Sequence, residues 1–144
     1  MVIKFANTKN EIERIIDLRY KILRQPWNQP KDTATDGNEL NTHNVFIEDK
    51  HGILVACGRL QENENQIGQI RYMAVDSNQQ GKGMGKLILK ALEAKAKEIG
   101  LKTIELQARE NALVFYETNH YQLREKSFLL WGVIQHYLMY KTLK

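Results

Sequence analysis

The sequence has little cysteine and no long hydrophobic run, and each shortage excludes a class of protein. One cysteine, Cys57, in 144 residues cannot form an internal disulfide or supply a thiolate cluster for zinc, so we expect a reducing cytoplasm and no metal. No apolar run is long enough to cross a bilayer, and the opening MVIKFANTKNEIERI turns polar too early for a secretory signal. With no repeat or low-complexity tract, residues 1–144 are expected to form one domain without membrane contact.

Charge of one sign is also scarce, and what excess exists is local. Lys and Arg number 21 against 17 Asp and Glu, a formal net charge of +4 that is too small to indicate nucleic acid. The segment 79–102 holds six lysines and two glutamates, so it carries the whole excess and the rest of the chain is neutral. A local excess suits a small polyanion better than a long one.

Hydrophobic periodicity predicts a mixed α/β domain around one sheet. Thr8 and Glu11 have the spacing of a capping box, which begins a helix that ends before Pro26. The other expected elements are strands over 2–5, 45–48, 53–60, 67–75, 103–108, 121–130 and 134–141, and helices over 84–99 and 112–118. In the longer of these, Met84, Leu87, Ile88, Ala91, Leu92 and Ile99 are expected to be buried, and Lys86, Lys90, Glu93 and Lys97 exposed. Gly68 allows a bulge or a close backbone approach within its strand.

A glycine-rich segment joins the strand over 67–75 to the following helix. Gly81, Gly83 and Gly85 remove side chains where the backbone must approach a ligand, and their N–H groups, with those of the helix start, can cradle phosphate oxygens. Lys82 and Lys86 add positive charge. A turn that only joins strand to helix is the alternative. The P-loop and Rossmann patterns both fail, because Leu87 follows Lys86 and the glycines lack the required spacing.

Gln80, Gly83 and Gly85 fit the pattern Gln/Arg-x-x-Gly-x-Gly/Ala, which resembles motif A of the GNAT family, the Gcn5-related N-acetyltransferases. The stretch from Leu106 to Glu117, with its Leu, Ala, Asn and Tyr, resembles a second segment of that family. The resemblance covers the whole chain in element order and residues 70–121 in specific motifs. It implies a central mixed, mostly antiparallel sheet with a splayed pair of strands, flanked by helices, and acetyl transfer from acetyl-CoA to a primary amine.

The resemblance also implies roles for individual residues. The pantetheine arm of acetyl-CoA is expected to pair with Met73, Ala74 and Val75, where a backbone N–H can stabilise the oxyanion, and to contact Asn111. Tyr116 is the expected proton donor to the leaving thiolate, although it could instead be a core aromatic, and Asn111 could cap a helix. The expected pyrophosphate cradle comprises Gln80, Gly81, Lys82, Gly83, Met84, Gly85 and Lys86. Homodimers are common in the family.

The general base is left open by the sequence. Relatives often place a glutamate on the strand before motif A, but residues 67–75 contain no carboxylate. His136, Glu48 or a chain of waters can take that role, and we name His136 beside Tyr116 as catalytic. A sensor that binds acetyl-CoA without turnover is the alternative function.

The acceptor amine is likewise open. The first helix, the loop over 24–42 and the last two strands are expected to surround it. Acidic residues of that loop, Asp32, Asp36 and Glu39, either attract a cationic amine or are simply solvated. Residues 18–25 weakly resemble the ElaA-like branch of the family. At residues 118–121, where relatives often have a Gly-Phe ending, Asn119 is expected to tolerate a left-handed conformation, and His120 replaces the glycine.

Overall fold

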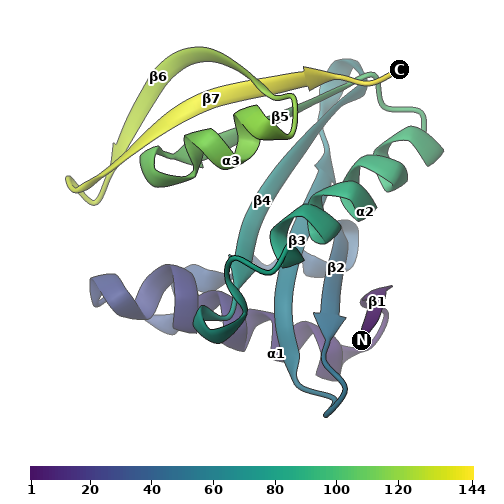
Figure 1. The fold of residues 1–144 in the computed structure, drawn as a ribbon, viewed down its shortest axis with the longest axis vertical. Helices are drawn as coiled ribbons and strands as arrows, with labels where there is room; N and C mark the ends of the chain where they lie inside the picture. Colours follow the sequence, from purple (N-terminus) through teal and green to yellow (C-terminus); the bar gives the residue numbers. More distant parts are fainter.

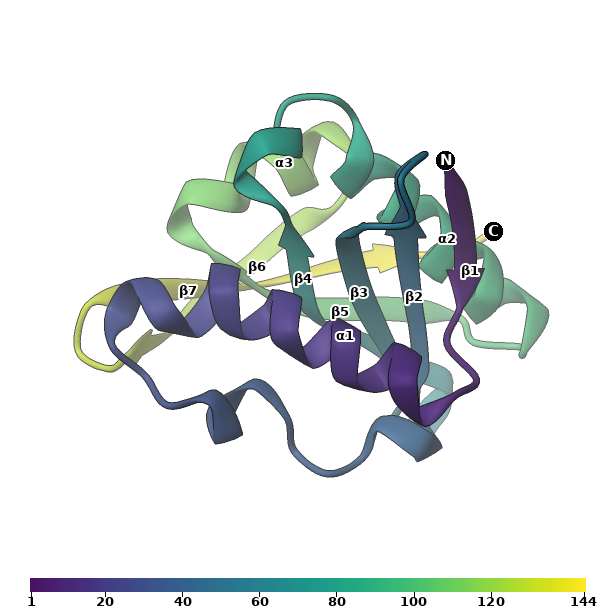
Figure 2. The ribbon, with the colours of Figure 1, turned by 90° about the horizontal axis from the view of Figure 1, so that it is seen from below.

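The computed structural model describes residues 1–144, which form a seven-stranded sheet in the order β1-β2-β3-β4-β5-β7-β6. All neighbouring strands are antiparallel except β4 and β5. The main helix α2 covers one face of the sheet and α1 the other (Figures 1 and 2). The bounds are β1 Val2–Phe5, α1 Lys9–Arg19, β2 His43–Glu48, β3 Leu54–Glu62, β4 Ile67–Val75, α2 Met84–Glu98, β5 Thr103–Arg109, α3 Leu113–Thr118, β6 Gln122–Leu130 and β7 Ile134–Thr142. The expected mixed α/β architecture is confirmed.

The first helix begins at the predicted capping box and changes its winding near its end. The Thr8 hydroxyl accepts from the Glu11 amide at 3.2 Å, and the Glu11 carboxylate accepts from the Thr8 amide at 3.2 Å. After α1 the chain forms a π-helical stretch over Tyr20–Arg24 and a 3₁₀ turn over Gln25–Trp27. Wide turns of this kind are frequent at functional sites, and this one brings Leu23 and Arg24 to a cavity described below.

The buried face of α2 differs from the predicted one. Leu89 is fully buried, Leu87 is 37% exposed, and Glu93 is buried rather than solvated. The Glu93 carboxylate accepts a hydrogen bond from the Tyr121 hydroxyl at 2.9 Å and pairs with the Lys141 ammonium at 3.2 Å. Because these two partners replace water, a glutamate can lie on the inner face and tie α2 to β7.

None of the helices combines the length and the apolar character that a membrane span requires.

A bulge in β4 determines which side chains reach each face of the sheet. Cys57 pairs with Ala74 and Arg59 with Arg71. Tyr72 and Met73 therefore lie opposite the single residue Gly58 of β3. Tyr72 has a φ of +56°, in the left-handed region that a bulky side chain rarely adopts. The extra residue places Arg71 and Tyr72 on the same face, where the Arg71 guanidinium lies 4.7 Å from the Tyr72 ring.

Gly68 supports the sheet by close packing and not by a bulge. A Cβ added there would lie 2.8 Å from Leu101 and 2.9 Å from Leu60. The parallel pairing of β4 with β5 covers only Ile67–Ile70 against Thr103–Leu106. Beyond this short ladder the two strands diverge, as the predicted splay requires. Cys57 is buried in the small core under α1.

Candidate functional site

A cavity of about 390 Å³ opens where β4 and β5 diverge. It extends from the end of the first helix to the hairpin of β6 and β7, and none of the residues that line it is an Asp or a Glu. The lining residues are Leu23, Arg24, Gln69, Ile70, Arg71, Tyr72, Met73, Leu106, Gln107, Arg109, Ala112, Tyr116, Phe128, Leu130 and His136. Both residues predicted to be catalytic, Tyr116 and His136, therefore lie at this one cavity.

Tyr116 lies on α3 in a dry aromatic environment. Its ring meets those of Phe115 and Tyr121 edge to face, with centroids 5.0 and 5.8 Å apart. Burial raises the pKa of Tyr116 well above its ordinary value. The phenol therefore keeps its proton across the neutral range and is a hydrogen-bond donor toward a group in the cavity.

His136 reaches the cavity from β7, where it is paired in register with Arg109 of β5. Its ring stacks on Phe128 at 4.4 Å, and its Nδ1 lies 3.1 Å from the Ile134 carbonyl oxygen. Because a carbonyl only accepts, Nδ1 carries the proton and Nε2 keeps its lone pair. Burial lowers the pKa of His136, with the charges of Arg109 and Arg24 adding to the effect against the carbonyl contact. A neutral imidazole is thus available as a base.

Glu48, the other side chain considered as a base, is excluded by its position. It lies at the end of β2, where the Arg14 guanidinium donates to its carboxylate at 2.8 Å, and it does not line the cavity.

The glycine-rich loop follows β4 and is held to it by Gln80, whose side-chain amide donates to the Val75 carbonyl at 3.1 Å. Gly81 and Gly83 have φ values of +79° and +83°, and no atom lies within 4 Å of a Cβ built on either. They are therefore required for backbone conformation and for open space above the loop. Gly85 has a packing role, because a Cβ added at this position would lie 3.2 Å from the Phe115 ring.

The start of α2 is an uncapped helix N-terminus. Gly83 is the N-cap and supplies no side chain, and no acidic residue lies in the first turn. The first helical hydrogen bond runs from Leu87 to the Gly83 carbonyl at 3.1 Å, so the amides of the first turn are free. Together with the exposed Lys82 and Lys86, they could hold an anion such as a pyrophosphate.

Two further residues, Asn111 and Met73, are expected to contact acetyl-CoA. Asn111 is exposed in the turn between β5 and α3, and it does not cap α3, whose N-cap is Ala112. The backbone of β4 beyond Ile70 has no partner on its β5 side, which leaves a strand edge to which an extended ligand can hydrogen-bond. Met73 lies on this edge and lines the cavity.

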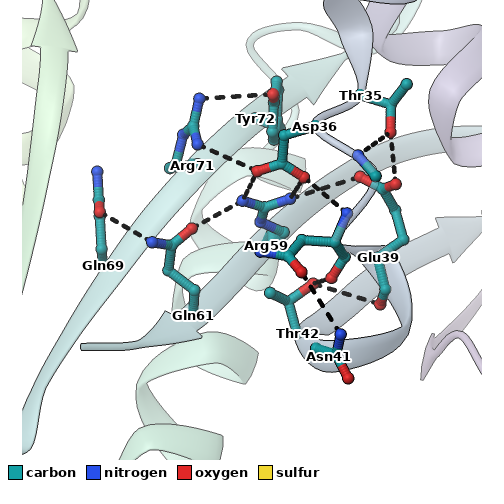
Figure 3. Close-up of polar contacts among 12 residues, drawn as sticks. Thr35, Asp36, Glu39, Asn41, Thr42, Arg59, Gln61, Gln69, Arg71 and Tyr72 are labelled. Atoms are coloured by element: carbon teal, nitrogen blue, oxygen red, sulfur yellow. Dashed lines mark hydrogen bonds and ion pairs between the residues drawn. The ribbon is translucent and has the colours of Figure 1, made fainter. Parts of the chain in front are cut away.

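Two of the three acidic loop residues, Asp36 and Glu39, are engaged in ion pairs, whereas Asp32 is exposed. Asp36 accepts from the two terminal nitrogens of Arg59 at 2.8 and 2.6 Å, and Arg71 approaches it at 3.3 Å (Figure 3). Glu39 pairs with Arg19 at 3.1 Å and with Arg59 at 3.4 Å. The Arg59 hydrogen bonds hold the pKa of Asp36 well below its usual range. These two carboxylates neutralise buried arginines and fix the loop on the sheet, so the suggested attraction for a cationic amine is wrong for them.

Two arginines of the cavity, Arg24 and Arg109, were not singled out from the sequence. A usable signal existed for Arg109: residues 104, 106 and 108 form the buried side of β5, so alternation places Arg109 beside Gln107 on the other side. Both side chains do line the cavity. The π-helical winding that positions Arg24 has no signal of this kind.

The fold and the site together define an acyl-transferring enzyme, and residues 12–121 match the acetyltransferase (GNAT) family. The chain therefore belongs to the GNAT family and is an N-acetyltransferase. It is 27% identical over 129 residues to an uncharacterized N-acetyltransferase, YjcF, from Bacillus subtilis (strain 168), covering 89% of this chain and 91% of that protein.

Solved structures share the fold at low sequence identity. A GNAT-family acetyltransferase from Staphylococcus aureus Mu50 has a TM-score of 0.81 at 19% identity, covering 99% of this chain and 100% of the other. An aminoglycoside 6'-N-acetyltransferase complexed with coenzyme A has a TM-score of 0.83 at 17% identity, covering 100% of this chain and 98% of the other. The predicted family, fold and type of enzyme are thus confirmed.

Proposed function

We propose that the chain transfers the acetyl group of acetyl-CoA to a primary amine by direct attack in a ternary complex. The observation that carries the proposal is the cavity at the divergence of β4 and β5, which Tyr116 and His136 both line. The glycine loop and the start of α2 lie at the end of β4 that bounds this opening. One strand therefore connects an anion site to a pair of groups able to move protons.

In this proposal acetyl-CoA binds along β4. The first-turn amides of α2, the loop over 80–86 and its two lysines hold the pyrophosphate. The pantetheine arm hydrogen-bonds to the free edge over 73–75 and to Asn111, and a backbone N–H near Met73 or Ala74 stabilises the oxyanion.

The chemistry then needs one proton removed and one supplied. The amine nitrogen attacks the thioester carbonyl carbon, forming the C–N bond, and the C–S bond breaks with its electron pair leaving on sulfur. His136 Nε2, directly or through water, takes the proton that the amine loses. The Tyr116 hydroxyl donates toward the leaving thiolate, so the products are an N-acetylated amine and the free thiol of coenzyme A.

Calorimetry with acetyl-CoA, followed by thiol release across a pooled amine library, tests the proposal. We expect binding and release from the wild type, and we expect Gly83→Val to abolish binding while the protein still folds. Gly52→Val is the matched control, because Gly52 has a φ of +75°, open space around its Cβ, and a place in the distant β2–β3 turn. Tight binding by Gly83→Val would remove the cradle from the proposal.

A sensor that binds acetyl-CoA without turnover is the second candidate, favoured by the lack of any carboxylate in the cavity. Binding without thiol release across the whole library would support it. The ElaA-like assignment, a cytoplasmic location and homodimerisation stay predictions.

A further inference from the structure

Every charged side chain that lines the cavity proposed to hold the acceptor amine is an arginine. Arg24, Arg71 and Arg109 line it, and no Asp or Glu does. Arg71 is paired with Asp36 at 3.3 Å, whereas neither of the other two has a carboxylate partner. An acceptor amine is commonly cationic in water, so a cavity of this charge is unexpected for a plain amine.

Arg24 and Arg109 contact only backbone carbonyls. Arg109 Nη2 donates to the Leu23 oxygen at 3.1 Å, and Arg24 donates from Nε to Thr33 and from Nη1 to Leu23, both at 3.1 Å. Arg24 Nη2 and the Nε and Nη1 of Arg109 therefore remain free to donate. Burial, and then repulsion from Arg24, lowers the pKa of Arg109 to about 10. A partly buried charge without a counter-ion destabilises the protein, which points to a ligand as the missing partner.

Two tryptophans hold these guanidinium groups in place. Arg109 lies over the Trp27 ring at 4.7 Å and Arg24 over the Trp131 ring at 5.3 Å, while the two indoles are 6.4 Å apart. Stacking occupies the faces of a guanidinium and leaves its in-plane N–H groups free. Those edges match the planar arrangement of oxygens in a carboxylate, or two oxygens of a phosphate.

We propose that the acceptor is a small molecule that carries an oxyanion, carboxylate or phosphate, as well as its amine. This inference rests on the proposed function. The oxyanion binds Arg24 and Arg109, and the amine faces the side of the same cavity that Tyr116 lines. A polycationic acceptor meets the uncompensated positive charge of both arginines and is disfavoured.

Matched acceptor pairs test this proposal by thiol release. The pairs are β-alanine with propylamine, phenylalanine with phenethylamine, and O-phosphoethanolamine with ethanolamine. We expect the anionic member of the preferred pair to have a kcat/KM at least about tenfold higher. Arg109→Gln is expected to raise the KM of the anionic acceptor about tenfold or more, while kcat and the acetyl-CoA Kd change little. Arg109→Lys is expected to restore part of the low KM. Arg124→Gln is the charge-matched control, because Arg124 lies on the exposed strand β6 and pairs with Glu105 of β5.

A second measurement does not need the right acceptor. Benzoate and phenyl phosphate are titrated into protein saturated with coenzyme A, which occupies the pyrophosphate cradle. We expect at least one of them to bind, with a Kd that rises about tenfold in Arg24→Gln and in Arg109→Gln but not in Arg124→Gln. The two anions distinguish a carboxylate from a phosphate.

The outcomes separate the two proposals. Failure of both anions to bind, or preference for the neutral member of every turned-over pair, would overturn the anionic acceptor even if acetyl-CoA binds and thiol is released. Failure of acetyl-CoA to bind would overturn the proposed function. The two anions would then be titrated into the free protein, where the Arg24 and Arg109 variants still decide whether the arginine pair is a site.

Discussion

Tyr72 connects the strain in β4 with the charges of the site. Its left-handed φ of +56° costs about 1–2 kcal/mol for a residue with a side chain. Its ring lies within 4.2, 5.8, 5.0 and 4.7 Å of four guanidinium carbons, those of Arg19, Arg24, Arg59 and Arg71. Cation–π contacts contribute about 0.5–1 kcal/mol each at exposed sites and more when desolvated, so together they offset the strain. Two of these arginines, Arg24 and Arg71, also line the cavity, so the bulge in β4 is stabilised in part by cations of the site.

Tyr116→Phe tests the proton donor. The change removes the hydroxyl and keeps the ring that packs on Phe115 and Tyr121. We expect kcat to fall about 10–10³-fold, the lower range for an acid–base group, with little change in the acetyl-CoA Kd. Tyr140→Phe is the control, since that hydroxyl donates to Gln122 on β6. Unchanged kcat at saturating substrates would remove Tyr116 from the mechanism.

The lowered pKa of His136 predicts where activity is lost in acid. Free histidine titrates near pH 6.5, and burial shifts the pKa of His136 lower. The base should thus stay neutral down to below pH 6.5 and fail on further acidification. We expect the ratio of wild-type to His136→Gln kcat/KM to be flat above that pH and to fall below it. The ratio cancels titration of the amine itself.

The control for this profile is His43→Gln, since His43 pairs with Glu62 away from the cavity. A ratio that stays constant from about pH 5 to 8 would show that another group or a water chain takes the proton.

At the scale of the element, α2 and α3 end in the same motif with different residues. The amides of Gly100 and Leu101 donate to the carbonyls of residues 97 and 96, and those of His120 and Tyr121 to residues 117 and 116. Both patterns are Schellman motifs, in which the first of the two residues is left-handed. His120 has a φ of +73°, so His120 is the left-handed residue. The sequence had suggested Asn119 for this conformation.

His120→Gly is therefore expected to stabilise the protein by about 0.5–1 kcal/mol, because it removes the steric cost of a left-handed side chain and retains part of the entropic cost of glycine. Thermal unfolding would show a rise of roughly 2–4 °C per kcal/mol. Gly100→His makes the reverse change at the matched position and should lower the Tm. Equal effects of the two substitutions would contradict this account.

The sequence predicted most elements but not the irregularities that build the site. Periodicity located β4, β5 and α2, and the paired glycines located the open loop that we propose as the anion cradle. The buried position of Glu93 depends on Tyr121 and Lys141, which are distant in sequence. The bulge at Tyr72 likewise depends on its register with β3. Pairings of this kind arise only when the sheet assembles, so a local pattern cannot specify them.

Over the whole molecule, a formal net charge of only +4 conceals charges that are separated in space. Outside residues 79–102 the formal charges cancel, yet Asp36 and Glu39 are shared by Arg19, Arg59 and Arg71, while Arg24 and Arg109 have no carboxylate. The chain therefore presents two positive sites, the exposed glycine loop and the recessed cavity. Counting charge along the sequence located only the first.

Because the parallel ladder is short, acetyl-CoA bound as proposed would link the two parts of the sheet. β4 and β5 are joined in register only over Ile67–Ile70, so an arm lying along the free edge of β4 would add hydrogen bonds that the protein lacks. At 100 times its Kd, a ligand that binds only the folded state adds about 2.7 kcal/mol of stability.

When acetyl-CoA is bound, we expect hydrogen exchange to slow most over residues 71–75 and 80–86 and least at β1. ADP, which has a pyrophosphate but no pantetheine arm, should protect 80–86 alone. Identical protection by ADP and acetyl-CoA would mean that the arm does not pair with β4, and the proposed position of the thioester beside Tyr116 would have to be abandoned.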